Sequence, residues 1–94
     1  MKLRWSPESL GDLIDVGDYL EARNPSAADA TLQRIRVAIL ALKTFPEAGR
    51  PGRVAGTREL VVTGTPYIVT YRVAGNCIDV LRIYHGARRW PDAL

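Results

Sequence analysis

The spacing of apolar residues changes once along this chain, and that change limits what the chain can fold into. Between residues 6 and 45, apolar side chains recur every three or four positions, as in a helix with one buried face. From residue 58 onward they lie in short stretches rich in β-branched and aromatic residues, which is typical of strands. The 94 residues have room for one domain, over residues 1–94, that holds both kinds of element.

Two helices are expected in the first half. Ser6 can cap a helix that begins at Pro7 and ends near Arg23, and Asn24 can cap a second that begins at Pro25. Residues 44–46 close the second helix. The apolar stripes are Leu10, Leu13, Ile14, Gly17 and Leu20 in the first helix and Ala28, Leu32, Ile35, Ile39 and Leu42 in the second. The short connector predicts an antiparallel helical hairpin.

Four strands are expected, at residues 2–5, Arg58–Val62, Tyr67–Val73 and Ile78–Tyr84. Residues 46–57 hold two Pro and three Gly, which indicates a loop. The last three strands follow one another through short turns, so they predict an antiparallel meander, which the opening strand joins. The sequence therefore predicts an α+β fold in the order β-α-α-β-β-β, with the helical hairpin on one face of the sheet.

Both faces of this sheet are expected to be apolar. Alternation places Tyr67, Val69, Tyr71 and Val73 opposite Ile68 and Thr70, and Ile78 and Val80 opposite Leu81 and Ile83. Two helices cover only one face, so the other face needs a cover. We expect a partner protein to supply it; the alternative is that residues 85–94 fold back over it.

The composition is that of a globular protein, with 47% apolar and 24% charged residues. No apolar run approaches the ~20 residues that a membrane span needs. Cys77 is the only cysteine, so it is expected to be a small buried or half-buried side chain rather than part of a disulfide. Residues 1–5 lead straight into polar residues and do not resemble a signal peptide. We expect a cytoplasmic protein that does not contact membranes.

The positive charge is concentrated in the second half. Residues 1–49 carry six Lys or Arg against seven acidic residues, a net charge of −1, whereas residues 50–94 carry seven Arg against three acidic residues, a net charge of +4. Arginine is favoured where planar contact with phosphate or carboxylate matters. This half is either ordinary solvated surface or it meets an anionic partner, which is a nucleic acid or an acidic protein segment.

Most enzyme signatures are missing. The sequence has no phosphate-binding glycine loop, no dinucleotide fingerprint and no metal-ligand spacing, so we expect no cofactor and no metal. The segment after the last strand is the most unusual one, since it places the only histidine, His85, near Arg88, Arg89 and Trp90.

Four blocks of the sequence resemble the ParE/RelE toxin superfamily. They are residues 45–50 (Phe-Pro-Glu-Ala-Gly-Arg), 57–61 (Thr-Arg-Glu-Leu-Val), 66–73 (Pro-Tyr-Ile-Val-Thr-Tyr-Arg-Val) and 83–91 (Ile-Tyr-His-Gly-Ala-Arg-Arg-Trp-Pro). Each block alone is a weak signal, but four in order at matching spacing are strong. With the order of the elements, the resemblance covers nearly the whole chain.

The resemblance implies the toxin of a type II toxin–antitoxin module. Its partner would be a cognate antitoxin, whose C-terminal half is disordered when free and folds around the toxin as helix and strand. Such antitoxin segments are commonly acidic, which suits the basic second half. The complex would be a hetero-oligomer, and the toxin alone is not expected to bind DNA sequence-specifically.

The two branches of the superfamily imply different targets. RelE-like members cut mRNA on the ribosome without a metal ion, and ParE-like members poison DNA gyrase. A metal-free nuclease needs a base and cationic stabilisers, for which His85 is the candidate base and Arg58, Arg82, Arg88 and Arg89 are the candidate cations.

The sequence favours the gyrase-poisoning branch. RelE-like members usually carry an Arg directly after the Tyr, where this chain has Ile68 after Tyr67, and Lys2 and Lys43 are its only lysines. An mRNA nuclease that uses His85, Arg58 and Arg88 is the alternative. A third possibility is a weakly toxic member that mainly binds its antitoxin.

The residues expected to contact target or antitoxin are Arg58, Tyr71, Arg72, Arg82, His85, Arg88, Arg89 and Trp90. Each also has a structural interpretation. His85 can satisfy a backbone carbonyl, Arg88 and Arg89 can pair with surface acids, and Trp90 can anchor the tail. Tyr67 and Tyr71 are more simply explained by packing. We expect the tail with His85, Arg88 and Arg89 to carry toxicity.

Overall fold

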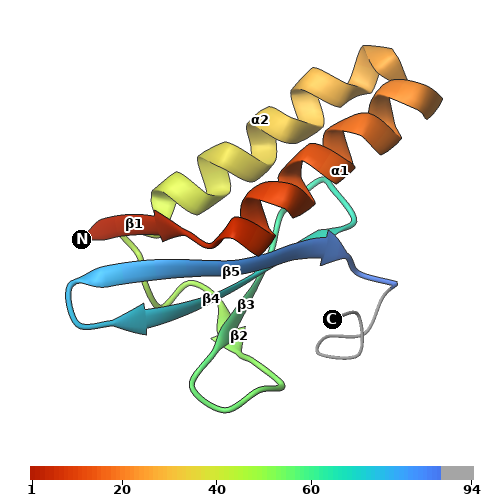
Figure 1. Ribbon diagram of the computed structural model, residues 1–94. Coiled ribbons are helices and arrows are strands. Elements are labelled where there is room, and N and C mark those ends of the chain that lie inside the picture. Colours follow the sequence, from red (N-terminus) through yellow and green to blue (C-terminus); the bar gives the residue numbers. More distant parts are fainter. Residues whose placement is uncertain (88–94) are drawn as a thin grey trace.

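The computed structural model describes residues 1–87 (Figure 1). It has the predicted α+β architecture, with two helices on one face of a five-stranded sheet. The strand order is β1-β5-β4-β3-β2. The strands are β1 (Lys2–Trp5), β2 (Arg50–Pro51), β3 (Arg58–Val61), β4 (Tyr67–Ala74) and β5 (Cys77–His85). The last three form the predicted meander, and β1 joins the sheet parallel to β5.

Strand β2 corrects the prediction of a continuous loop over residues 46–57. Its two residues pair antiparallel with β3, with Arg50 opposite Glu59 and Pro51 opposite Arg58. Proline cannot donate a ladder hydrogen bond, which confines it to edge strands and strand ends. The strand is therefore short and lies at the edge of the sheet, where the Pro- and Gly-rich composition gave no sign of it.

The two helices are α1 (Pro7–Arg23) and α2 (Pro25–Ala41). Ser6 caps α1 as predicted, because its Oγ accepts a hydrogen bond of 3.0 Å from the Ser9 amide. Asn24 lies at the expected cap of α2, but its side chain makes no capping bond. Its Oδ1 accepts instead from the Ser26 hydroxyl at 2.9 Å. The antiparallel hairpin of α1 and α2 covers one face of the sheet (Figure 1).

A β-bulge in β5 corrects the predicted faces of that strand. Thr70 pairs with Arg82 and Tyr71 with Val80, so Leu81 has no direct partner on β4. One extra residue reverses the alternation of the side chains that follow it. Ile83 therefore packs in the same core cluster as Val80, under the helices, and not on the opposite face.

The core lies between the helical hairpin and the sheet. It is built from buried Val16, Ile35, Ile39, Val62, Tyr67, Val69, Val80 and Ile83. Leu42, Tyr71 and Ile78 form a second cluster toward the other end. Trp5 packs partly buried against the main cluster. Cys77 is a half-buried free thiol.

The second sheet face, which the sequence predicts to be apolar and to need a cover, carries Ile68 and Tyr84. Ile68 and Tyr84 are buried there, with exposed fractions of 7% and 5%, and Val54 packs against them. Whether residues 88–94 help to cover this face lies outside the described residues. The exposed large apolar side chains include Val37, Leu40, Phe45 and Val61 on α2, the turn that follows it and β3.

No helix within residues 1–87 is both long enough and apolar enough to cross a membrane.

Candidate interaction site at the end of β5

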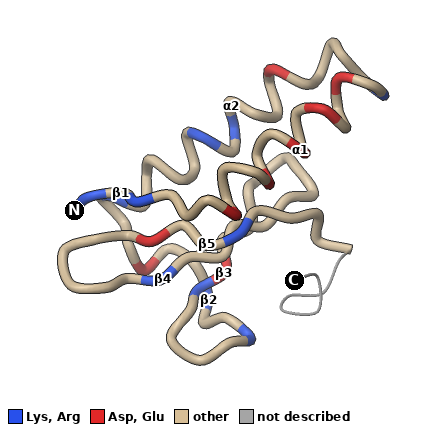
Figure 2. Tube along the Cα trace, viewed as in Figure 1, with Lys and Arg blue, Asp and Glu red and all other residues tan. Residues whose placement is uncertain are grey.

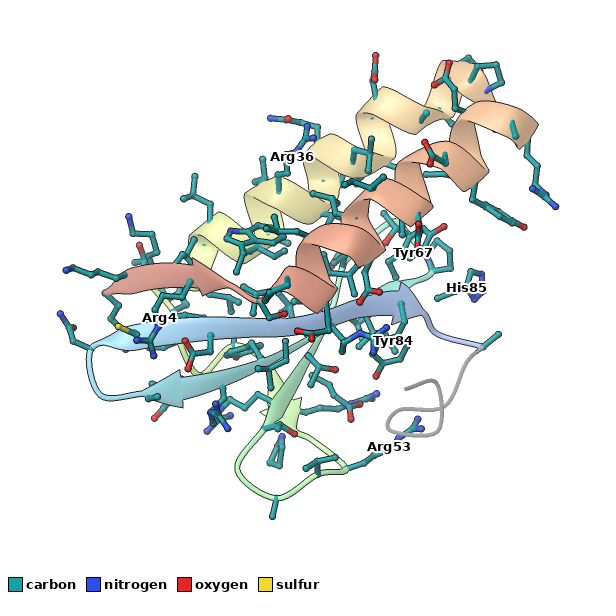
Figure 3. All side chains as sticks on the ribbon, viewed as in Figure 1. Arg4, Arg36, Arg53, Tyr67, Tyr84 and His85 are labelled. Carbon is teal, nitrogen blue, oxygen red and sulfur yellow. The ribbon has the colours of Figure 1, made fainter. Side chains whose placement is uncertain are left out.

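Tyr67 and His85 lie directly opposite each other at the paired ends of β4 and β5. Their rings meet edge to face, with centroids 5.7 Å apart and planes at 79°. Tyr67 is buried and His85 is exposed. Figure 3 shows both side chains near the arrowhead of β5, below α1, and Tyr84 on the other side of the strand.

The His85 ring is held by a backbone amide two residues later in the chain. Its Nδ1 accepts a hydrogen bond of 3.0 Å from the amide of Ala87. A neutral imidazole whose Nδ1 is an acceptor carries its proton on Nε2. His85 thus bonds a backbone N–H rather than the expected carbonyl, and Nε2 is the donor of the neutral ring.

A cavity of about 560 Å³ opens beside this ring pair, between α1 and the end of β5. It is lined by Asp12, Asp15, Val16 and Tyr19 from α1 and by Tyr67, Ile83, Tyr84, His85 and Ala87 from the sheet and the following turn. Its charged lining residues within the described part of the chain are two carboxylates. The cavity is therefore acidic and aromatic.

Asp12 ties α1 to β5. Its carboxylate accepts from Arg82 Nε at 2.7 Å and Nη2 at 2.9 Å, and from the Ile83 amide at 2.9 Å. The hydrogen bond to Asp12 raises the pKa of Arg82. Arg82, one of the predicted contact residues, therefore lies beside the cavity, with its charge offset by Asp12.

Arg58 and Tyr71 are neighbours in register on β3 and β4, far from His85. Tyr71 is fully buried; its hydroxyl accepts from the Gly49 amide at 2.8 Å and donates to the Pro46 carbonyl at 2.7 Å. Burial raises the pKa of this phenol. The Arg58 guanidinium donates to the Gly49 carbonyl at 2.7 Å. Both residues fix the segment that follows α2.

The structure does not bring Arg58 and His85 together. Arg58 pairs with Tyr71 and His85 with Tyr67, which lie four positions apart along β4, about 13 Å at the usual rise. Arg72 is farther still from His85, at the β4–β5 hairpin, where it lies 3.7 Å from Asp79. Arg88, Arg89 and Trp90 lie outside the described residues.

Charge is segregated over the surface. Figure 2 shows acidic residues along α1 and basic residues on β1 and in the middle of α2. At the hairpin end of the sheet, Arg4 Nε lies 2.6 Å from Asp79 and lowers the pKa of that carboxyl.

Among residues 1–87, no group of three or more His, Cys, Asp or Glu side chains is placed to hold a metal ion.

Sequence reasoning missed Asp12 and Asp15 as site residues. Helical spacing places them off the apolar stripe of α1, which is the usual position of solvated acids. The missing information was where β1 ends. Its last residue, Trp5, lies opposite Val80, so the rest of β5 has α1 beside it instead of a neighbouring strand. No local sequence signal reports that packing.

Comparison with known proteins identifies the family. The sequence model described as the ParE toxin of a type II toxin–antitoxin system, parDE, matches residues 3–90. This chain belongs to the ParE toxin family. As a ParE-family protein, it is the toxin type of a type II toxin–antitoxin system.

Individual relatives agree with the ParE family assignment. The protein Y4kP of Sinorhizobium fredii is 39% identical over 93 residues, which cover 99% of this chain and 96% of that protein. Toxin RelE2 of Caulobacter vibrioides is 38% identical over 84 residues, which cover 89% and 93%. The RelE branch name thus occurs among similar proteins, beside the ParE description of the family model.

Two solved structures share the fold. One is the chromosomal ParDE system from P. aeruginosa, at a TM-score of 0.83 and 31% identity, covering 90% of this chain and 95% of that chain. The other is the RelBE2 toxin–antitoxin complex from Mycobacterium tuberculosis, at 0.63 and 25%, covering 89% and 95%. The ParDE structure is the more similar of the two.

Proposed function

We propose that this ParE-family toxin arrests growth by binding and poisoning DNA gyrase, and that it does not cut RNA. The proposal joins the family assignment to the chemistry of the cavity beside His85. Gyrase is the target that the ParE branch implies. A cognate antitoxin would neutralise the toxin.

The observation that carries the proposal is the charge around His85. Asp12 and Asp15 line its cavity, and the arginine of β5, Arg82, already donates to Asp12 through Nε and Nη2. Since Asp12 and Arg82 offset each other, a phosphodiester brought to His85 would meet, among residues 1–87, the negative charge of Asp15, which repels it. A metal-free nuclease needs unoccupied cations at that place to stabilise the phosphorane.

The environment of Ile68 supports the same choice. This residue stands where RelE-like nucleases usually carry an arginine, and it is buried with Tyr84 and Val54. A charged side chain there would need desolvation without a partner. The separation of Arg58 from His85 adds to this, since the two cannot act on one phosphate.

We propose further that the antitoxin binds the groove between α2 and β3. The groove has a volume of about 470 Å³ and is lined on its apolar sides by Val37, Ala38, Ala41, Phe45, Leu60 and Val61. Strand β2 pairs only with Arg58 and Glu59, so Val61 lies on an edge that no described strand covers. Such an edge can accept a further strand, and Arg34 at the groove suits an acidic one.

The decisive test uses the purified toxin in two assays. One measures supercoiling and cleavage-complex formation by gyrase, and the other measures cleavage of mRNA on programmed ribosomes. The proposal expects gyrase inhibition that the antitoxin reverses, together with intact mRNA. Cuts at the ribosomal A site would instead establish the RelE-type activity, which the similarity to toxin RelE2 keeps as the second candidate.

A further inference from the structure

We propose that the cavity between α1 and the end of β5 binds an arginine side chain of the toxin's protein target. The inference rests on the proposed function, because it assigns the surface through which a target protein would be held. The cavity lies on the face that α1 shares with β5, away from the α2–β3 groove. Target and antitoxin would thus meet the toxin through different residues.

The first reason is an available carboxylate. Both carboxylate oxygens of Asp12 already accept hydrogen bonds from Arg82 and the Ile83 amide. Asp12 therefore contributes to the electrostatic field of the cavity but offers no free pair of oxygens to a ligand. Asp15, one turn later, is exposed and lines the cavity, and within residues 1–87 no cation lies within ion-pair distance of it. Among residues 1–87, Asp15 is therefore a lining carboxylate without an ion-pair partner, next to the paired Asp12 and Arg82.

The second reason is the aromatic lining. Tyr19 and His85 present exposed rings from the two walls, with Tyr67 buried beside His85, and a planar guanidinium stacks on such exposed rings. The molecule itself shows this affinity, since the Arg23 guanidinium carbon lies 4.0 Å from the centroid of the Tyr19 ring. That contact fixes Tyr19, which is half exposed, at the rim.

The cavity suits a guanidinium better than other ligands. The volume of the cavity, about 560 Å³, is far larger than the volume that one water molecule occupies in the liquid, about 30 Å³. Carboxylates exclude phosphates and acidic peptides, so nucleic acid is a poor occupant. A lysine ammonium would satisfy the charge, but it is a compact and strongly hydrated ion that gains less from flat rings.

The direct test titrates the full-length toxin with Nα-acetyl-arginine methylamide and follows backbone amide signals by NMR. The neutral citrulline analogue has the same shape and serves as the matched ligand. We expect the arginine probe to move the signals of Tyr19, Tyr67, His85 and Ala87 and to bind about tenfold tighter than citrulline, for one ion pair and one cation–π contact. Equal binding of the two probes, or shifts located elsewhere, would overturn the proposal.

Two variants assign the binding to these residues. Asp15→Asn should abolish the preference for arginine over citrulline, whereas Asp29→Asn makes the same charge change on α2, outside the cavity, and should keep it. Tyr19→Leu should weaken the arginine probe several-fold and Tyr19→Phe should not. If Asp15→Asn keeps the preference, the cavity is not the site.

A growth assay separates this inference from the proposed function. Asp15→Asn should reduce growth arrest and gyrase inhibition while binding the antitoxin normally. If wild-type toxin fails to inhibit gyrase, the proposed function is wrong, whatever the probe does. If wild type inhibits gyrase and Asp15→Asn inhibits it equally, the function stands and the assignment of this cavity to the target is wrong.

Discussion

Asp12 accepts hydrogen bonds of 2.7 and 2.9 Å from Arg82 through both oxygens of its carboxylate. These bonds join the first turns of α1 to the second half of β5. The same carboxylate accepts the Ile83 amide at 2.9 Å. It replaces the hydrogen bonds that a neighbouring strand would supply, since β1 has ended by that point. This one side chain therefore positions the wall of the acidic cavity.

Replacing Asp12 should destabilise the fold. Asp12→Ala removes three hydrogen bonds and leaves the mostly buried Arg82 charge without its partner, which should cost about 2–3 kcal/mol. Urea denaturation of the purified variants measures the loss. Asp18→Ala, an exposed acid on the same helix, should stay within about 0.5 kcal/mol of wild type. Equal stability of the two variants would contradict the structural role given to Asp12.

Two glycine substitutions should have opposite effects. A Cβ at Gly49 would lie 2.7 Å from the Tyr71 ring and 2.8 Å from its hydroxyl, so Gly49→Ala must displace a buried side chain and should cost about 1–3 kcal/mol. A Cβ at Gly11, within α1, meets nothing within 4 Å. Gly11→Ala should stabilise by about 0.5–1 kcal/mol through helix propensity. Thermal unfolding distinguishes the signs; a neutral Gly49→Ala would show that Tyr71 can move freely.

The carboxyl of Asp79 should make stability depend on acid pH. Its hydrogen bond with Arg4 lowers its pKa below the usual 3.8. The carboxylate therefore contributes stability that is fully present above about pH 3.8 and is lost as pH falls through the lowered value. Arg4→Met should raise the pKa of Asp79, measured by NMR titration. Since Arg72 stays 3.7 Å from Asp79, the pKa of Asp79 should return only part of the way to 3.8. An unchanged titration would mean that Arg4 does not hold this carboxyl in solution.

Phe45 should contribute to antitoxin affinity without stabilising the toxin. Its side chain is 64% exposed and lines the α2–β3 groove. Phe45→Ala should weaken antitoxin binding about tenfold or more, as loss of an aromatic anchor does, and leave stability within about 0.5 kcal/mol. Leu10→Ala truncates a side chain that is 49% exposed on α1, outside the groove, and should bind normally. Calorimetry measures both; equal affinities would remove the groove from the antitoxin interface.

Local signals were enough for every described element except β2. Ser6 with Pro7, and Pro25 after Asn24, began the two helices where the structure has them, because caps and fixed φ act within one turn. The short intervals between the last three predicted strands correctly indicated the turns of the meander. The four sequence blocks that resemble the ParE/RelE superfamily then indicated the kind of partner. The net charge alone could not do so, because it fits several kinds of partner.

What failed was non-local. The extra residue at Leu81 has no sequence mark, so alternation assigned Ile83 to the wrong face. Asp12 and Asp15 looked like solvated acids because their roles depend on which part of β5 lies next to α1. Arg58 and His85 are both plausible in a catalytic list, and only the pairing of β3, β4 and β5 shows that they lie apart.

The bulge at Leu81 also decides which chemical group the toxin presents at its end. If β5 instead continued past Val80 in regular alternation, with Leu81 opposite Thr70, the side chains after it would exchange sides of the sheet: the Tyr84 phenol would turn toward α1 and the His85 imidazole away from it. Deleting Leu81 would not cause that exchange, because Thr70 would still pair with Arg82 and Tyr67 with His85. The place of two residues opposite one, rather than the composition of the strand, therefore decides whether an imidazole or a phenol lies opposite Tyr67.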